Sequence, residues 1–143
     1  MYKVDTARNT ELSELLAKVF IIERGWMCSA AGNRDSPYDL VADLGDGKFE
    51  RIQVKKVSNK HKHIKRVVSR KNQKVTTKGK IRSTIDYAEL GIEWLFGVDI
   101  FTKEIFTYKL ETYKNLPQSI SVCKWECDDF PTNGIIRRNV DFV

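Results

Sequence analysis

The chain has 143 residues, of which 41% are hydrophobic and 31% charged. This composition suits one globular domain over residues 1–143 and excludes a disordered chain. No apolar run reaches the length of a membrane span, and the N-terminal residues lack the apolar stretch of a signal peptide. We therefore expect an intracellular, cytoplasmic protein. Its net charge of +6 favours a polyanionic partner.

The three cysteines, Cys28, Cys123 and Cys127, form an odd set without a Cys-x-x-Cys pair. This usage argues against a disulfide framework and fits a reducing compartment. Cys123 and Cys127 are spaced like half of a zinc site, but the sequence offers no second pair of ligands near them. We expect no zinc there.

The spacing of apolar residues over 9–24 predicts an amphipathic helix that ends at Gly25. The side chains expected to face the core are Leu12, Leu15, Leu16, Val19, Phe20 and Ile22. On the corresponding helical wheel, Glu11 lies on the flank of the buried face, where it could reach a site beside a sheet. Glu14 faces more nearly outward.

The rest of the chain is expected to form mostly strands. A short strand is predicted over 26–31, and a hairpin joins 38–44 to 48–57 through a Gly-Asp-Gly turn. Another strand follows at 63–69, then a polar basic loop at 72–82 and a short helix at 84–90. Segments 93–101 and 104–109 read as a second hairpin, 119–125 as a last strand, and 131–134 opens an irregular tail. A leading helix followed by strands predicts an α/β fold with a mixed sheet.

The first hairpin brings polar residues together if its turn is centred on Asp46. Asp39 then faces Gln53, and Lys55 shares their face because alternate strand residues point to the same side. Leu40 and Ile52 face each other on the opposite, apolar side. The alternative without a functional site is that these polar residues are ordinary solvent-facing residues of a half-exposed hairpin.

This group of residues suits the hydrolysis of a phosphodiester with the help of a metal ion. Mg²⁺ takes hard oxygen ligands, so Asp39 would be the main ligand, with the Gln53 side-chain oxygen and the Val54 carbonyl as neutral ligands. Lys55 could orient the attacking water or stabilise charge on the phosphate. Because Gln53 brings no negative charge, Glu11 is the candidate for an additional carboxylate. It could equally be a solvated glutamate favoured by the helix dipole.

A basic segment follows the hairpin directly. Residues 55–82 carry twelve Lys or Arg and no Asp or Glu, whereas the acids outnumber the bases elsewhere. A run of this length favours a nucleic-acid-binding surface over a merely solvated face. The predicted DNA-binding residues are Lys56, Lys60, Lys62, Lys65, Arg66, Arg70, Lys71, Lys74, Lys78, Lys80 and Arg82.

The segments 36–41, Ser-Pro-Tyr-Asp-Leu-Val, and 51–56, Arg-Ile-Gln-Val-Lys-Lys, resemble the PD-(D/E)XK nuclease superfamily. Within it, the chain is most similar to group I intron homing endonucleases of cyanobacterial type and to relatives of archaeal Holliday-junction resolvases. The resemblance implies a restriction-endonuclease-like mixed central β-sheet flanked by helices. It also implies Asp39 as metal ligand, Lys55 as the motif lysine and Glu11 as the helix carboxylate. Gln53 replaces the usual acidic residue, which favours the intron-encoded branch, whose members assemble as oligomers.

The resulting hypothesis is a site-specific double-strand DNA endonuclease that uses Mg²⁺, or alternatively Mn²⁺, as an intron homing enzyme. One alternative is a structure-specific nuclease that resembles Holliday-junction resolvases. A second is a catalytically inactive DNA-binding module, because Gln53 weakens the metal site. One small domain with one site cuts one strand at a time, so a double-strand break implies a homo-oligomer, a dimer or a tetramer.

Overall fold

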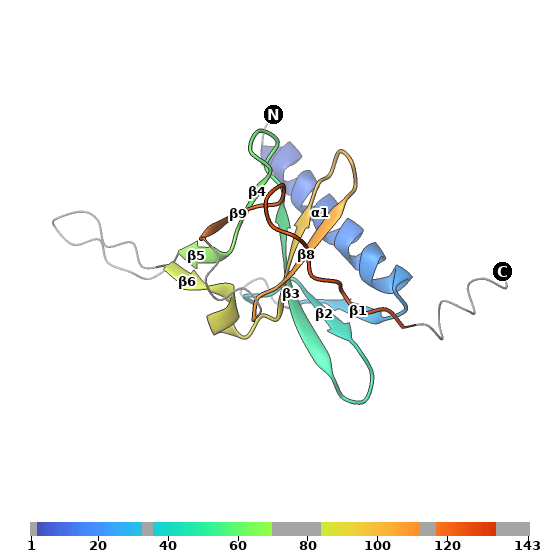
Figure 1. Ribbon diagram of the computed structural model, residues 1–143. Coiled ribbons are helices and arrows are strands. Elements are labelled where there is room, and N and C mark those ends of the chain that lie inside the picture. The colour runs from blue at the N-terminus through green and yellow to red at the C-terminus, as the bar shows by residue number, and fades with distance from the viewer. Residues whose placement is uncertain (1–2, 33–35, 70–83, 112–116, 134–143) are drawn as a thin grey trace.

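A computed structural model describes residues 3–32, 36–69, 84–111 and 117–133 (Figure 1). The elements in chain order are α1 (Lys3–Glu23), β1 (Met27–Ala30), β2 (Leu40–Asp43), β3 (Phe49–Lys56), β4 (His63–Lys65), β5 (Val67–Ser69), β6 (Thr84–Asp86), the 3-10 helix η1 (Tyr87–Leu90), β7 (Trp94–Val98), β8 (Ile105–Lys109) and β9 (Ser119–Ser121). None of the described helices is long and apolar enough to span a membrane.

A five-stranded sheet in the order β1-β2-β3-β7-β8 organises the fold. β3 and β7 pair in parallel, whereas the other neighbouring strands are antiparallel. The small two-stranded sheets β4–β9 and β5–β6 lie to the left of this sheet in Figure 1, and α1 lies to its upper right. The predicted α/β fold with a mixed sheet is therefore confirmed.

The predicted register of the first hairpin is confirmed. Leu40 of β2 pairs with Ile52 of β3. The turn between the strands consists of Gly45, Asp46 and Gly47, all with positive φ, at 82°, 54° and 76°. Glycine adopts such angles without steric cost, so this sequence closes the hairpin tightly and fixes which residues face each other.

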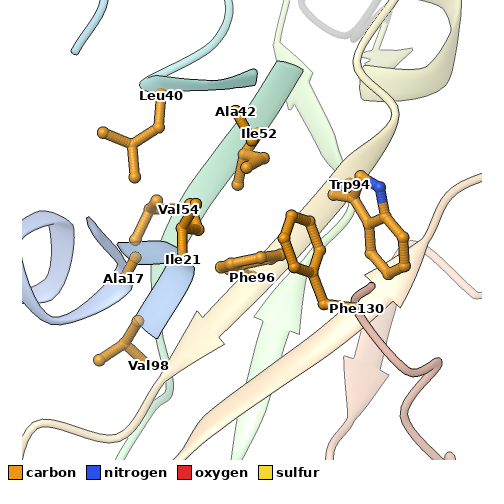
Figure 2. Packing of buried hydrophobic residues seen from close by; sticks show 10 residues of the cluster. All are labelled: Ala17, Ile21, Leu40, Ala42, Ile52, Val54, Trp94, Phe96, Val98 and Phe130. Carbon is orange, nitrogen blue, oxygen red and sulfur yellow. The ribbon is translucent and has the colours of Figure 1, made fainter. Parts of the chain in front are cut away.

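Two apolar clusters cover the two faces of the sheet. The first packs α1 on one face, and Figure 2 shows Ala17 and Ile21 of the helix beside Val54 of β3. Its buried members are Ala17, Ile21, Leu40, Ala42, Ile52, Val54, Trp94, Phe96, Val98 and Phe130. The second cluster holds β4, β9 and η1 against the other face, where Leu95 and Tyr108 are completely buried. Gln53 pairs with Leu95 across the sheet and so belongs to this second face.

The face of α1 that packs on the sheet differs from the predicted one. Ser13, Ala17 and Ile21 are buried, whereas Leu15 and Val19 are 52% and 49% exposed. The prediction that Leu15, Val19 and Ile22 face the core is therefore wrong, although Leu16 and Phe20 do pack against it. Small side chains at Ser13 and Ala17 let the helix lie close to the strands, and the distance between packed elements depends on the side chains at the contact.

Other predicted elements are present with changed bounds. The strand predicted over 63–69 is divided at Arg66, whose N–H donates to Gln118 O at 2.9 Å and whose carbonyl accepts from Tyr87 N at 3.2 Å. The predicted helix over 84–90 is β6 followed by η1, with Asp86 as its N-cap. The second hairpin is confirmed as β7 and β8, and the last strand ends at Ser121. The predicted loop at 72–82 lies outside the described residues.

The three cysteines are free thiols. Cys28 is half-buried, and the desolvation that burial causes raises the pKa of its thiol to about 11. Because the thiolate is the reactive form, Cys28 is an unreactive packing residue at neutral pH.

Candidate active site

Asp39 lies at the point where β2 begins to pair with β3. Its N–H donates to Ile52 O at 2.9 Å, and its carboxylate Oδ2 accepts a hydrogen bond of 2.8 Å from Val54 N. Two residues earlier, Pro37 has no N–H to donate, which limits further pairing of this segment. The Asp39 side chain thus takes the position that a backbone carbonyl would occupy in a longer β2.

Gln53 and Val54 lie directly beside this carboxylate. Gln53 Nε2 donates to the Val54 carbonyl at 3.5 Å, and Val54 N binds Asp39. The structure therefore brings together the three residues that the sequence proposed as metal ligands.

Lys55 continues the same strand face as Gln53. Its Nζ lies 5.3 Å from the ring centre of the buried Tyr87, the first residue of η1. Its positive charge also acts on Asp39 and lowers the pKa of that carboxyl group. Lys55 therefore lies within electrostatic range of the candidate metal ligands, as the hairpin register predicted.

Desolvation dominates the electrostatics of Asp39. Burial raises the pKa of its carboxyl group above the ordinary value, and the hydrogen bond from Val54 and the charge of Lys55 oppose this rise. A half-buried carboxylate with too little compensating positive charge favours the approach of a cation.

Glu14 is the helix carboxylate that the structure places beside Asp39. It is half-buried, and desolvation, the charge of Asp39 and the charge of Glu11 all raise the pKa of its carboxyl group. Both carboxylates line a cleft of about 310 Å³, and its walls are Glu14, Ala30, Ala31, Gly32, Ser36, Tyr38 and Asp39.

The prediction that Glu14 faces outward is therefore wrong. Glu11 is exposed and does not line this cleft, although it was the predicted helix carboxylate. Both differences follow from the rotation of α1 that buries Ser13 and Ala17. A helical wheel that places these small residues in the core turns Glu14 toward the sheet edge. The small residues were therefore the sequence signal that could have identified Glu14 as the helix carboxylate.

The two carboxylates of the cleft, together with the oxygens of the adjacent β3, fit a divalent metal. Within the described residues, no three His, Cys, Asp or Glu side chains gather closely enough to hold an ion by themselves. A bound ion would therefore take two carboxylates, Asp39 and Glu14, together with the neutral oxygens of Val54 and Gln53. Mg²⁺ suits such a set, because it binds through one or two carboxylates and keeps several of its waters.

The predicted DNA-binding residues differ in how they are held. Lys56, Lys60 and Lys65 are exposed. By contrast, Lys62 forms an ion pair of 2.9 Å with Asp99, and the buried Arg66 is paired with Asp86.

Arg66 therefore serves the fold rather than an exposed binding surface. It is only 8% exposed, and its Nε donates to Pro117 O at 3.3 Å. Its predicted role as a surface DNA contact does not fit this position. The other candidates lie outside the described residues: Arg70, Lys71, Lys74, Lys78, Lys80 and Arg82.

The comparisons with known proteins agree with this fold. A family model described as PD-(D/E)XK endonuclease matches residues 4–116, and the chain belongs to this family. It is therefore a nuclease, its substrate is DNA, and its family generally uses divalent metals.

A solved structure described as a bacterial homing endonuclease, I-Ssp6803I, has the same fold. It is 15% identical, with a TM-score of 0.61, and the alignment covers 92% of this chain and 93% of that one. No protein with a curated description matches the sequence.

Proposed function

We propose that the protein is a Mg²⁺-dependent, site-specific endonuclease that cuts both strands of DNA, with Mn²⁺ as an alternative ion. The observation that carries this proposal is the cleft that Glu14 and Asp39 line together, in which Asp39 also accepts a hydrogen bond from Val54 N and lies within electrostatic range of Lys55. If these two carboxylates had only a structural role, no cation would compensate for their desolvation and mutual repulsion. Burying like charges side by side lowers the stability of the fold.

The chemistry of hydrolysis divides among these groups. A divalent ion held at the cleft would supply positive charge for the phosphate and would make water a better nucleophile by lowering its pKa. Asp39 and Glu14 would hold it, and the Val54 carbonyl and the Gln53 amide oxygen would complete its protein ligands. The Lys55 ammonium group would stabilise negative charge that develops on the phosphate or orient the attacking water.

The exposed lysines support binding to the DNA backbone. Lys56 ends β3 immediately after Lys55, and Lys60 and Lys65 follow on the next segment. Lysines that continue from the candidate site can neutralise phosphates on either side of the scissile bond. Sequence specificity requires contacts with base edges in addition, and these residues do not identify them.

One observation and one implication of the sequence resemblance favour a homing endonuclease over a junction resolvase. The solved structure with the same fold is described as a homing endonuclease. The resemblance also implies that glutamine at position 53 is a feature of the intron-encoded branch. A homing enzyme cuts both strands, so we include a homo-oligomer, a dimer or a tetramer, in the proposal. We also propose that the protein is located in the cytoplasm.

The decisive experiment compares Glu14→Gln with Glu11→Gln. The protein is incubated with Mg²⁺ and a randomised linear DNA library, and cleaved sequences are selected and then used in a single-turnover assay. We expect Glu14→Gln to lower the cleavage rate at least about 100-fold, as the loss of a metal-binding or electrostatic group does. Glu11→Gln is the matched control and should stay within about threefold of wild type.

Several outcomes would contradict the proposal. Equal loss in both variants would show that Glu14 has no special place in the site. Wild-type protein that never cuts the library would instead support an inactive DNA-binding module. Cleavage confined to branched DNA, with linear duplexes left intact in the same assay, would support the resolvase alternative.

A further inference from the structure

α1 is apolar on two opposite sides. Ser13, Ala17 and Ile21 are buried against the sheet, whereas Leu15, Val19 and Ile22 point away from it and are 52%, 49% and 49% exposed. The elements on which α1 packs most extensively are all strands of the five-stranded sheet, and Figure 1 shows the helix on the outside of the molecule. A helix that is apolar all round is usually covered on both sides.

The exposed residues form one continuous stripe, the α1 outer stripe, made of Leu15, Val19 and Ile22. Their spacing of four and then three residues places them along a single line on the helix, the spacing found where two helices pack together. Glu11 and Lys18 run along one flank of this stripe, and Leu12 lies on the other.

We propose that the α1 outer stripe binds the same stripe of a second copy, with the two helices antiparallel about a twofold axis near Leu15. In such a pair the two helices run in opposite directions along the interface. Each flank of one helix lies against the same flank of the other helix. Leu15 then meets Leu15 of the second copy, Leu12 meets Val19, and Glu11 meets Lys18.

Charge complementarity selects this arrangement. An antiparallel pair places Glu11 of each copy opposite Lys18 of the other, which gives two attractive contacts beside the apolar centre. A parallel pair about a twofold axis would instead bring the flank with Glu11 and Lys18 against the flank with Leu12, so that both attractive contacts would be lost. The chain therefore offers an apolar seam together with charges that favour one orientation.

This inference rests on the proposed function only for its biological purpose. Glu14 neighbours the flank that carries Glu11, and a twofold axis across the helix pair keeps this flank of both copies on the same side. Both candidate metal sites would thus face one DNA duplex. A chain with one site per copy could then cut both strands.

The test measures the mass of the full chain in solution without metal or DNA. Sedimentation velocity over about 1 to 100 μM protein should show a dimer, or a tetramer, that dissociates on dilution, as expected for a small interface. Val19→Glu should raise the dissociation constant at least about tenfold while circular dichroism stays unchanged, because Val19 is exposed. Phe49→Glu is the matched control, since Phe49 is 59% exposed and lies outside α1, at the start of β3 next to the β2–β3 turn, and it should not alter the mass.

A charge exchange tests the orientation. Glu11→Lys or Lys18→Glu alone should weaken association, and the double variant should restore it. Failure of the double variant to recover would exclude the antiparallel pairing. A wild-type monomer, or an oligomer that Val19→Glu leaves intact, would overturn the inference. So would a monomer whose melting temperature falls in Val19→Glu, because another segment of the same chain would then cover the stripe.

These results are independent of the cleavage assay. A monomer that nicks DNA would refute the self-association surface and leave the proposed nuclease function standing. An inactive dimer that Val19→Glu dissociates would support the surface and refute the function.

Discussion

Lys55 Nζ lies 5.3 Å from the ring centre of Tyr87, so a buried aromatic ring supports the lysine of the candidate active site. Tyr87 begins η1, and Asp86 both caps this short helix and pairs with Arg66. The contact between Lys55 and Tyr87 thus connects the strand that carries the site to the second apolar cluster. A cation over an aromatic face is attracted to it and loses part of its freedom.

We predict that Tyr87→Leu lowers the single-turnover cleavage rate about tenfold with little change in DNA affinity. Loss of the ring would leave the Lys55 ammonium group mobile, and small misplacements of a charged group near the reaction are costly. Tyr87→Phe keeps the ring and should retain most of the rate. If Tyr87→Phe were as slow as Tyr87→Leu, the ring would not be what positions Lys55.

Asp39→Asn should abolish cleavage and yet stabilise the metal-free protein at neutral pH. Because burial raises the pKa of Asp39 in the folded state, ionisation of this group costs stability once the pH exceeds that pKa. The stability gap between variant and wild type should therefore be present at neutral pH. It should close as the pH falls through the raised pKa toward the ordinary value of about 3.9.

Thermal unfolding with and without Mg²⁺ checks this prediction. At a concentration about 100-fold above its dissociation constant, the ion should stabilise wild type by about 2.7 kcal/mol and leave Asp39→Asn nearly unchanged. Equal stabilisation of both proteins by Mg²⁺ would place the metal elsewhere.

The basic segment should separate into DNA-binding and structural residues. Lys60→Ala with Lys65→Ala should weaken DNA binding and reduce the slope of log affinity against log salt by about 1.8, because two phosphate contacts are lost. Arg66→Ala should destabilise the fold by about 3 kcal/mol, the cost of leaving a partner charge unpaired in a buried site.

Fluorescence anisotropy at several salt concentrations and denaturant unfolding measure the two effects. The sequence alone had suggested Lys62 and Arg66 as phosphate contacts, but both are paired with acids, Asp99 and Asp86. An unchanged salt slope in the double lysine variant would show that Lys60 and Lys65 are only solvated.

Asp99 should stabilise the turn between β7 and β8 in a pH-dependent way. It accepts hydrogen bonds from Lys62 Nζ at 2.9 Å and from Phe101 N at 3.0 Å, and the bond from Lys62 is the main reason that the pKa of Asp99 is lowered. A carboxylate with a lowered pKa stabilises the folded state above its ordinary pKa, and this contribution is lost as the pH falls through the lowered value.

Asp99→Asn should therefore cost on the order of 1 kcal/mol at pH 7. The difference from wild type should begin to shrink below about pH 4, where the carboxyl group of the unfolded chain becomes protonated before that of the folded protein. Urea unfolding at both pH values checks this expectation, and a difference independent of pH would contradict the role of the Asp99 charge.

The hairpin and the grouping of its polar residues could be predicted because their information is local. The Gly-Asp-Gly turn fixes the register, and strand alternation then brings Asp39, Gln53 and Lys55 together. The helix carboxylate could not be predicted in the same way. α1 carries apolar residues on both sides, so the larger Leu15 and Val19 suggested a buried face that Ser13 and Ala17 occupy instead.

The structural role of the basic residues was hidden for a related reason. Asp86 and Asp99 lie 20 and 37 positions beyond their partners Arg66 and Lys62 in the sequence, and only the fold brings them together. A run of lysines and arginines indicates where positive charge is concentrated. It does not indicate which of these side chains form ion pairs with acidic residues of another element. Sequence patterns therefore find the basic surface more reliably than its individual contacts.

The hydrogen bond between Val54 N and Asp39 Oδ2 gives one carboxylate two tasks. It continues the pairing of β2 with β3, and it is also the main candidate ligand for the metal. A copy of this gene that lost its nuclease function would still need an acceptor for the Val54 N–H. Among relatives that have lost nuclease activity, asparagine at position 39 should therefore be tolerated far more often than alanine. Replacement of Asp39 by alanine would remove the strand contact and the metal ligand together, so the two effects could not be separated.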